Sequence, residues 1–446
     1  MARCDDSGGG AAGRTPKGGA YRPRNPRANP LYQCAQRHVG ELRPEGRLRR
    51  LVEDKVISRF LQCGDPHHGF ARVYCPQCRH DYLLAFSCKA RYFCPSCHQK
   101  RVLAYGDWVE ANVLAPVPHR QYVFTVPRIL RASFSRRRRL LGALCQIVEK
   151  LLREAYRAAW PGGREGLVVF VQTFGDLVTF NPHIHVLAAD GVFAQDETFF
   201  VLPPVPHRLL ERRFRDEVLA LLLCEGEISE GLVKRITAWR HTGFSVHNGV
   251  KVRDAAGRQK LAQYMLRAPF SLEKMKYDQR TGMVLYRSHL HKSLKRNYQL
   301  MPGAQWLELL CRHIPDRFEH LVRYVGWYSC RCRGERARLG VTAPVADGAA
   351  PVDPMANAVR ARSAWARLIY KVYEVDPLEC PKCKGAMQVI ALIDDPAVVR
   401  RILKHLHQWS PARRFIPARG PSYVAPECVQ GAPLNEHTYH PVPDIA

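Results

Sequence analysis

Residues 181–187 read Asn-Pro-His-Ile-His-Val-Leu, and this short stretch decides how the rest of the chain is interpreted. Alternation between histidine and apolar residues, a period of two, is typical of a strand. Successive side chains of a strand point to opposite faces, so His183 and His185 share one face of a sheet while Ile184 points into the core behind it. Two imidazoles placed in this way can bind one metal ion. They are equally compatible with ordinary surface or core histidines, so the motif alone leaves both interpretations open.

A second predicted strand, residues 167–174, precedes this one and is joined to it by a polar connection. Pairing of the two strands as a hairpin would bring the side-chain oxygen of Gln172 beside both imidazole rings. An ion held by two nitrogens and one amide oxygen keeps open positions for substrate oxygens, as catalysis requires. Gln172 is therefore the predicted third metal ligand.

Other predicted elements follow one another on both sides of this hairpin. They are a strand at 121–126 that Pro127 stops, helices at 140–155 and 209–223, a strand at 244–252, a helix at 259–268 and a hairpin at 275–287. This order predicts an α+β fold whose sheet, within about residues 120–300, is mostly antiparallel.

The helix expected at 259–268 contains Tyr264 between two basic residues. Lys260, Tyr264 and Arg267 follow the i, i+4, i+7 spacing and would share one helix face. An ordinary phenol is protonated at neutral pH and is a poor nucleophile, but flanking cations favour its anion and can also hold a phosphate. The alternative is an interfacial tyrosine without a chemical role.

Two cysteine pairs lie upstream, Cys75-Pro-Gln-Cys78 and Cys94-Pro-Ser-Cys97, with fifteen residues between them. Two short-spaced thiol pairs can each hold one side of a tetrahedral Zn²⁺, so the sequence predicts a structural zinc ribbon. Cys88 could replace one of the four ligands, or it could build a second site with other residues nearby, such as Cys63. The N-terminus has no apolar signal segment, which favours thiolate metal sites over disulfides.

A further pair, Cys380-Pro-Lys-Cys383, is half of such a site. Three interpretations are open for it. It could pair with Cys330 and Cys332, it could pair with His405 and His407, or it could bind no metal.

The chain of 446 residues has 68 Lys and Arg against 40 Asp and Glu, a formal net charge of +28. An excess of this size predicts a polyanionic partner, most simply nucleic acid, although a basic surface can also serve solubility alone. The apolar runs are too short to span a membrane, so we expect a cytoplasmic protein without a membrane partner. The residues predicted to contact DNA are Arg136, Arg137, Arg138, Arg139, Lys260, Arg267, Lys292, Lys295 and Arg296. The clusters of basic residues at 136–139 and 292–296 could instead be solvated faces.

Composition and motifs divide the chain into six predicted segments. They are a disordered basic arm at 1–30, a helical segment plus zinc-binding domain at 31–112, the α+β domain at 113–300, a helical extension and Arg/Ala/Pro-rich linker at 301–362, a small module at 363–410 and a Pro-rich tail at 411–446.

Taken together, these motifs resemble the transposases of the insertion sequence 91 family, a branch of the HUH endonucleases. The resemblance rests on residues 172–175 and 181–187, on Asp190-Gly191-Val-Phe, on the cysteine-rich stretch 86–97 and on residues 114–127, and it continues through 375–383 to His405. It covers about residues 35–410.

The resemblance implies an HUH endonuclease core that acts on single-stranded DNA at element ends and on target DNA. It implies that His183, His185 and a third polar group hold Mg²⁺ or Mn²⁺ against the scissile phosphate. Tyr264 would attack the phosphorus and leave a free 3′-OH and a 5′-phosphotyrosine bond, and rejoining would complete a rolling-circle type of transposition. Such a protein would be associated with the nucleoid, and its oligomeric state is left open.

One departure from the family pattern concerns the tyrosine helix. Some relatives carry two tyrosines four residues apart, whereas positions 260 and 268 here are Lys and Ala. The chain resembles the single-tyrosine form, so two tyrosines of one subunit are not expected to alternate in cleavage.

Two rival hypotheses remain from the sequence. A rolling-circle replication initiator or conjugative relaxase shares the histidine and tyrosine motifs, but a helicase loop of the form G-x-x-x-x-G-K-[ST] is absent from the sequence. A zinc-dependent DNA-binding protein with an inactive nuclease fold is the non-catalytic alternative.

Overall fold

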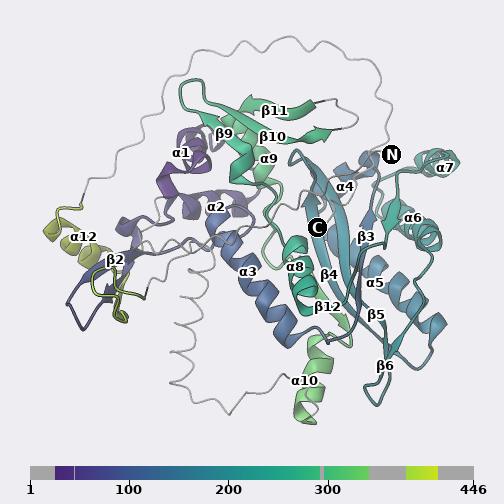
Figure 1. The fold of residues 1–446 in the computed structure, drawn as a ribbon. Coiled ribbons are helices and arrows are strands. Elements are labelled where there is room, and N and C mark those ends of the chain that lie inside the picture. Colours follow the sequence, from purple (N-terminus) through teal and green to yellow (C-terminus); the bar gives the residue numbers. More distant parts are fainter. Residues whose placement is uncertain (1–25, 45, 292–295, 341–377, 410–446) are drawn as a thin grey trace, which may run out of the picture. The chain divides into compact units, whose positions relative to one another are not determined.

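The computed structural model describes residues 26–44, 46–291, 296–340 and 378–409 (Figure 1), although side chains at 289–291 and 296 are not described. These residues form two compact units. Residues 64–86 and 378–409 make up the smaller unit, and the other described residues make up the larger one. The mixture of helices and antiparallel strands confirms the predicted α+β class.

The larger unit is built on an antiparallel sheet whose centre is β4 (Arg164–Phe174), β5 (Phe180–Phe193) and β3 (His119–Thr125). The strand order is β12-β4-β5-β3-β7, and two short strands pair at the side of this path, β6 with β5 and β8 with β3. The shorter strands are β12 (Val322–Gly326), β7 (Ser245–His247), β6 (Phe199–Val201) and β8 (Lys251–Val252).

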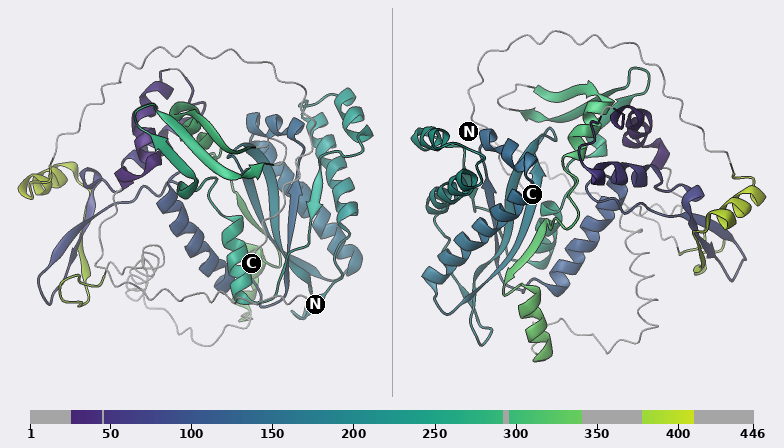
Figure 2. Two further views of the ribbon diagram at one scale, coloured as in Figure 1. Left: turned by 45° about the horizontal axis from the view of Figure 1, so that its top comes forward. Right: turned by 180° about the vertical axis from the view of Figure 1, so that it is seen from behind.

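Helices cover both faces of this sheet (Figures 1 and 2). On one face, α5 (Arg139–Ala159) and α6 (His207–Cys224) pack against Ile184 and Val186 of β5. On the other face, α3 (Pro95–Asn112) and α8 (Ala255–Met265) lie side by side over Phe170 and Leu187. Because both faces are covered, β4 and β5 are buried along nearly their whole length.

A second part of the larger unit packs around the buried Trp306. It contains a three-stranded sheet, so the predicted hairpin at 275–287 is confirmed and is extended by a third strand. Its elements are α1 (Pro30–Leu42), α2 (Leu51–Leu61), β9 (Met275–Asp278), β10 (Met283–His291), β11 (Arg296–Pro302) and α9 (Gly303–Cys311). Two short helices, α4 (Arg131–Arg136) and α7 (Glu230–Ala238), lie elsewhere in this unit.

The smaller unit is a three-stranded antiparallel sheet with one helix (Figure 1). The order is β13-β1-β2, and the elements are β1 (Phe70–Tyr74), β2 (Asp81–Ala85), β13 (Gln388–Ile393) and α12 (Pro396–His405). The C-terminal residues were expected to form a module of their own, but β13 pairs with β1. Backbone hydrogen bonds between such distant segments leave no periodic signal in either one.

Three local differences from the expected elements have simple causes. The strand predicted at 244–252 is two short strands, β7 and β8, separated by residues 248–250. Helix α8 starts earlier than expected because the Asp254 side chain caps it, and it ends at Met265. The predicted linker begins instead with α10 (Cys330–Arg338), which the Ser329 side chain caps.

Several predicted segments fall outside the described residues. They are most of the basic arm at 1–30, the linker residues 341–362, the Pro-rich tail at 411–446, and Lys292 and Lys295. In the part of the chain that the structure describes, no helix is long and apolar enough to cross a membrane.

Candidate functional site

The two histidines of β5 lie on the same face of the sheet, toward α8. His183 pairs in register with Gln172 of β4, and His185 pairs with Phe170. The ring centroids of His183 and His185 are 4.8 Å apart. Both imidazoles are buried.

A backbone carbonyl orients the ring of His183. Its Nδ1 lies 2.8 Å from the carbonyl oxygen of Asn181, and a carbonyl can only accept a hydrogen bond. Nδ1 therefore carries a proton, and in the neutral form of the ring the lone pair is on Nε2. This is the arrangement that a metal-binding histidine usually has, with the nitrogen that faces away from the metal bonded to a protein acceptor.

A glutamine side chain contacts the ring of His185. Nε2 of Gln121, on β3, lies 2.9 Å from Nδ1 of His185 and donates a hydrogen bond to it, so in this arrangement Nδ1 carries the lone pair of the ring. Nε2 of His185 is a buried atom without a hydrogen-bond partner among the described residues, and it gains the lone pair when the Gln121 amide turns so that its oxygen accepts from Nδ1–H. Burial, followed by the nearby His183 and Arg267, keeps the pKa of His185 well below its ordinary value. The ring is therefore neutral.

The side chain of Gln172 links the histidine sheet to the tyrosine helix. Its Nε2 donates to the carbonyl oxygens of Met265 at 2.7 Å and Tyr264 at 3.3 Å. These bonds identify Nε2 as the donor atom, and Oε1 is left buried without a hydrogen-bond partner in the described part of the chain. The pairing of Gln172 beside His183, expected from the hairpin, is confirmed. Its role as a ligand stays a prediction.

Tyr264 lies next to the paired imidazoles. Its ring centroid is 5.9 Å from that of His185, and the two rings are nearly perpendicular. The guanidinium carbon of Arg267 lies 4.5 Å from the centre of the Tyr264 ring, although Arg267 follows the end of α8 and was expected within the helix. Lys260 is on the same helix and is exposed.

The buried polar atoms of this site fit a divalent metal ion. Two imidazole rings and one buried amide oxygen without a partner among the described residues offer three donor groups on neighbouring strands, and Nε2 of His185 is also without a partner there. The amide oxygen suits Mg²⁺ or Mn²⁺, and imidazole is a common ligand of divalent transition metals. Gln121 was not predicted as a site residue, although it begins a predicted strand in which aromatic and β-branched residues follow it.

Eight of the described cysteines form two sets of four. One set is Cys63, Cys88, Cys94 and Cys97, and the other is Cys75, Cys78, Cys380 and Cys383, with all ligand atoms of a set within 4.8 Å of one another. The predicted ligand set of Cys75, Cys78, Cys94 and Cys97 is therefore wrong, because its two pairs lie in different clusters. The cause is the C-terminal pair, which completes the cluster of the first pair.

The cluster at Cys63 fits a structural zinc ion. Its sulfur–sulfur distances include 3.6 Å from Cys88 to Cys97 and 3.9 Å from Cys63 to Cys94. A tetrahedral Zn²⁺ with bonds of about 2.3 Å places its sulfurs about 3.8 Å apart. The backbone N–H of Cys88 lies 3.5 Å from the sulfur of Cys63, which stabilises a thiolate there.

The basic run 136–139 is divided between two environments. Arg136, Arg137 and Arg139 are exposed and pair with Glu225 or Glu227. Their contact with DNA stays a prediction.

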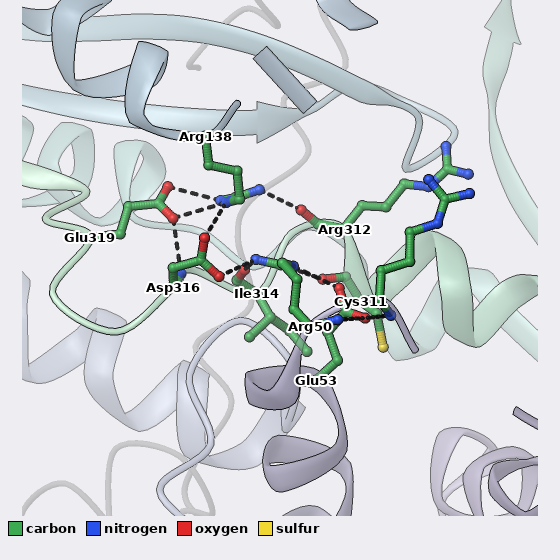
Figure 3. Close-up of polar contacts among 9 residues, drawn as sticks. Arg50, Glu53, Arg138, Cys311, Arg312, Ile314, Asp316 and Glu319 are labelled. Atoms are coloured by element: carbon green, nitrogen blue, oxygen red, sulfur yellow. Dashed lines mark hydrogen bonds and ion pairs between the residues drawn. The ribbon is translucent and has the colours of Figure 1, made fainter. Parts of the chain in front are cut away.

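Arg138 is the exception in this run, because it is buried (Figure 3). Its guanidinium donates to both carboxylate oxygens of Glu319 at 2.8 Å and to the carbonyl oxygen of Arg312. The expectation that Arg138 contacts DNA is therefore wrong, because its donors are already used inside the protein. The same network includes Asp316, which also receives a hydrogen bond from Arg50 (Figure 3).

Comparisons with known proteins match two parts of the chain to family models. Residues 34–126 match the model described as "Transposase zinc-binding domain", and residues 166–336 match the model described as "Putative transposase". No solved structure matches the chain.

Two curated proteins are similar in sequence. The transposase for insertion sequence element IS801 of Pseudomonas savastanoi pv. phaseolicola is 26% identical over 404 residues, 84% of this chain and 91% of that protein. The putative transposase y4qJ of Sinorhizobium fredii (strain NBRC 101917 / NGR234) is 30% identical over 175 residues, 37% of this chain and 42% of that protein.

Proposed function

Because this chain belongs to the insertion sequence 91 family of transposases, we propose that it nicks one DNA strand at the ends of an insertion sequence with Tyr264 and rejoins that strand to target DNA. The proposed partner is single-stranded DNA, which agrees with the formal net charge of +28. Work on DNA would associate the protein with the nucleoid.

The observation that carries this proposal is the position of Tyr264 against the metal-site strands. Its ring lies 5.9 Å from the His185 ring, and the Gln172 amide binds the Tyr264 carbonyl directly. Nε2 of Gln172 binds backbone carbonyls at the end of α8 and so fixes the position of that helix end beside the histidine strand, while its Oε1 has no partner among the described residues. The same glutamine therefore positions the tyrosine and offers an oxygen to the site.

Three residues would hold the divalent ion, namely His183 and His185 through Nε2 and Gln172 through Oε1. Bound Mg²⁺ or Mn²⁺ would polarise the scissile phosphate and neutralise the charge that develops on it. Asn181 holds a proton of the His183 ring on Nδ1, and the Gln121 amide would do the same for His185 once its oxygen faces the ring. Arg267, beside the Tyr264 ring, would bind a phosphate oxygen.

In the proposed reaction, the phenolic oxygen of Tyr264 forms a bond to phosphorus while the bond from phosphorus to the 3′ oxygen breaks. The phenol loses its proton, and the departing oxygen gains one to become a free 3′-OH. The phosphodiester energy is kept in the 5′-phosphotyrosine bond, so attack by a target 3′-OH reverses the step without ATP. The thiolate cluster at Cys63 would bind structural zinc and would not take part in this exchange.

The test is incubation of the protein and Mn²⁺ with labelled single-stranded DNA that carries the element ends. We expect an SDS-resistant protein–DNA adduct from the wild type and none from Tyr264→Phe. Tyr277→Phe is the matched control, because Tyr277 lies on β9 and bonds to His38 instead. An adduct that survives in Tyr264→Phe would refute the nucleophile, and a wild type that binds both ends without cleaving either would favour a non-catalytic DNA-binding protein.

His183→Ala separates binding from cleavage. DNA affinity draws mainly on phosphate contacts, so this variant should keep its affinity and lose the adduct. Equal loss of both would show that the histidine pair is structural.

A further inference from the structure

Two four-residue turns of the smaller unit share one backbone geometry. In Cys75-Pro-Gln-Cys78, the N–H of Cys75 donates to the carbonyl of His80 at 2.8 Å, and the N–H of Arg79 donates to the carbonyl of Cys75 at 2.9 Å. In Cys380-Pro-Lys-Cys383, the N–H of Cys380 donates to the carbonyl of Gly385 at 2.8 Å, and the N–H of Lys384 donates to the carbonyl of Cys380 at 2.9 Å.

The residue after each pair also has the same unusual conformation. Arg79 has φ +57° and Lys384 has φ +62°, in the left-handed region that long side chains rarely adopt. Such a turn folds the backbone around the two sulfurs. Its occurrence twice, at positions far apart in the sequence, indicates that both turns are built for the same ligand.

The two turns face each other and their sulfurs are crossed. Cys75 Sγ lies 3.5 Å from Cys383 Sγ, and Cys78 Sγ lies 3.4 Å from Cys380 Sγ. These separations are far longer than a disulfide bond of about 2.05 Å and close to the value of about 3.8 Å for two thiolates on one zinc ion.

The turns are also held together by a side chain. Gln77, inside the first turn, lies 3.7 Å through its Oε1 from the sulfur of Cys383. The same oxygen occupies the space where a side chain at Gly385 would begin. The two turns therefore pack closely against each other, and the four sulfurs lie between them.

The apolar contacts of this unit are too few to hold it together alone. One small cluster contains Val73, Met387 and the sulfurs of Cys75 and Cys380, and a second contains Phe70, Val399 and Leu403. Small modules with so little buried apolar surface usually need a metal or a disulfide to fold.

We propose that Cys75, Cys78, Cys380 and Cys383 form a second structural zinc site. Its two pairs are far apart in the sequence, because Cys383 lies 308 positions after Cys75 and Cys380 lies 302 positions after Cys78. Four thiolates in tetrahedral order suit Zn²⁺. The C-terminal half lies outside both matched family models, which cover 34–126 and 166–336. The ion fixes β13 beside β1, so folding of the smaller unit depends on the metal and on both halves together.

The first experiment counts metal in the purified full chain. We expect two zinc ions per chain in the wild type and one in Cys380→Ser/Cys383→Ser. Cys330→Ser/Cys332→Ser is the matched control, because this pair lies near the end of the larger unit and in neither cluster, and it should keep two ions. Unchanged zinc in Cys380→Ser/Cys383→Ser, or iron in place of zinc, would overturn the proposal.

The second experiment uses the wild type and does not depend on how a variant folds. Cys78, Cys383 and Cys330 are all exposed, so all three should react with a thiol reagent unless a metal protects them. With zinc bound, we expect Cys330 to alkylate at least tenfold faster than Cys78 and Cys383. Removal of zinc with a chelator should make the four cluster cysteines reactive together. Alkylation of Cys383 as fast as Cys330 in the zinc-loaded protein would refute the site.

Discussion

His98 Nε2 lies 2.8 Å from the carbonyl oxygen of Leu266, so helix α3 holds the end of the helix that carries Tyr264. His98 Nδ1 accepts a hydrogen bond from the N–H of Tyr92, which leaves the proton of the ring on Nε2 for donation to Leu266. His98 follows Cys97 directly in the sequence. The thiolate cluster and the tyrosine helix are therefore joined through one buried imidazole.

We expect His98→Ala to slow cleavage without weakening DNA binding. The change leaves two buried backbone groups without partners, which costs about 1–3 kcal/mol of folding free energy and loosens the helix end beside Tyr264. We expect adduct formation at saturating DNA to slow by about tenfold or more, since a misplaced reacting group is costly. His98→Gln keeps a donor for Leu266 and should recover part of the rate. An unchanged adduct rate in a folded His98→Ala would contradict the positioning role.

Gln172 provides a test of the third metal ligand. Gln172→Leu removes both the donor to Met265 and the unpartnered Oε1, so we expect Mn²⁺ affinity, measured by calorimetry on the full chain, to fall at least tenfold. Gln263→Leu, on the same helix as Tyr264 but turned toward Gly106 of α3, is the control and should bind Mn²⁺ as the wild type does. Equal affinity in Gln172→Leu and wild type would exclude Gln172 as a ligand.

Gln121 is expected to act on the metal through His185. When a metal binds Nε2 of His185, the ring proton is on Nδ1 and needs an acceptor, which the Gln121 amide supplies by turning its oxygen toward the ring. Gln121→Leu should therefore weaken Mn²⁺ binding by about 10- to 100-fold, and Gln121→Glu, which keeps an acceptor oxygen, should weaken it less. If Gln121→Leu and Gln121→Glu lose the same Mn²⁺ affinity, Gln121 does not act by orienting the His185 ring.

The local part of this site could be predicted because it depends on patterns within a few residues. Alternation along 181–187 placed both histidines on one face, and the hairpin placed Gln172 opposite His183. The i, i+4 spacing of Lys260 and Tyr264 on a predicted helix indicates Tyr264 as a candidate, and in the structure its ring lies close to that of His185. The zinc-binding segment was indicated in the same way by short Cys-x-x-Cys spacing.

The rest depends on which distant segments meet, and no local pattern records that. Cys75 and Cys78 had a nearer candidate partner in Cys94 and Cys97, and only the pairing of β13 with β1 shows that Cys380 and Cys383 complete their cluster. Arg138 was predicted as a DNA contact because it stands among exposed arginines, but the carboxylate that pairs with it comes from residue 319.

Arg138 and Arg139 are neighbours with opposite expected phenotypes. The side chain of Arg138 is 8% exposed and pairs with a nearly buried Glu319, whereas that of Arg139 is 66% exposed. Loss of one partner of a buried pair costs about 3–5 kcal/mol, and loss of an exposed pair costs less than about 1 kcal/mol. Urea unfolding should thus show a large loss of folding free energy for Arg138→Ala and almost none for Arg139→Ala. Arg139→Ala should instead weaken DNA binding and reduce the salt dependence of that binding. A stable Arg138→Ala with weakened DNA binding, or an unstable Arg139→Ala, would contradict these different roles.

Asp190 should make the larger unit less stable as the pH falls into the acidic range. Its side chain is 3% exposed and receives hydrogen bonds from Arg120 at 2.7 Å and Lys251 at 2.6 Å. Burial raises the pKa of Asp190, but the hydrogen bonds from Arg120 and Lys251 outweigh burial and hold the pKa below its ordinary value. A carboxyl group of this kind stabilises the fold above its unfolded pKa of about 3.9, and that contribution is lost as the pH falls through the folded pKa.

Asp190→Asn should therefore reduce the free energy of unfolding by about 3 kcal/mol at pH 7, because two cations lose their charged partner. The difference between wild type and variant should start to shrink as the pH falls below about 4, and it should be lost as the pH falls through the lower pKa of the folded state, where the wild-type carboxyl also becomes neutral. Taking the difference removes the acid sensitivity of the thiolate clusters, which both proteins share. Asp216→Asn, at an exposed carboxylate on α6, is the control and should show a small difference at every pH. If the difference in free energy of unfolding between wild type and Asp190→Asn stays constant from pH 7 to pH 3, Asp190 contributes through packing and not through its charge.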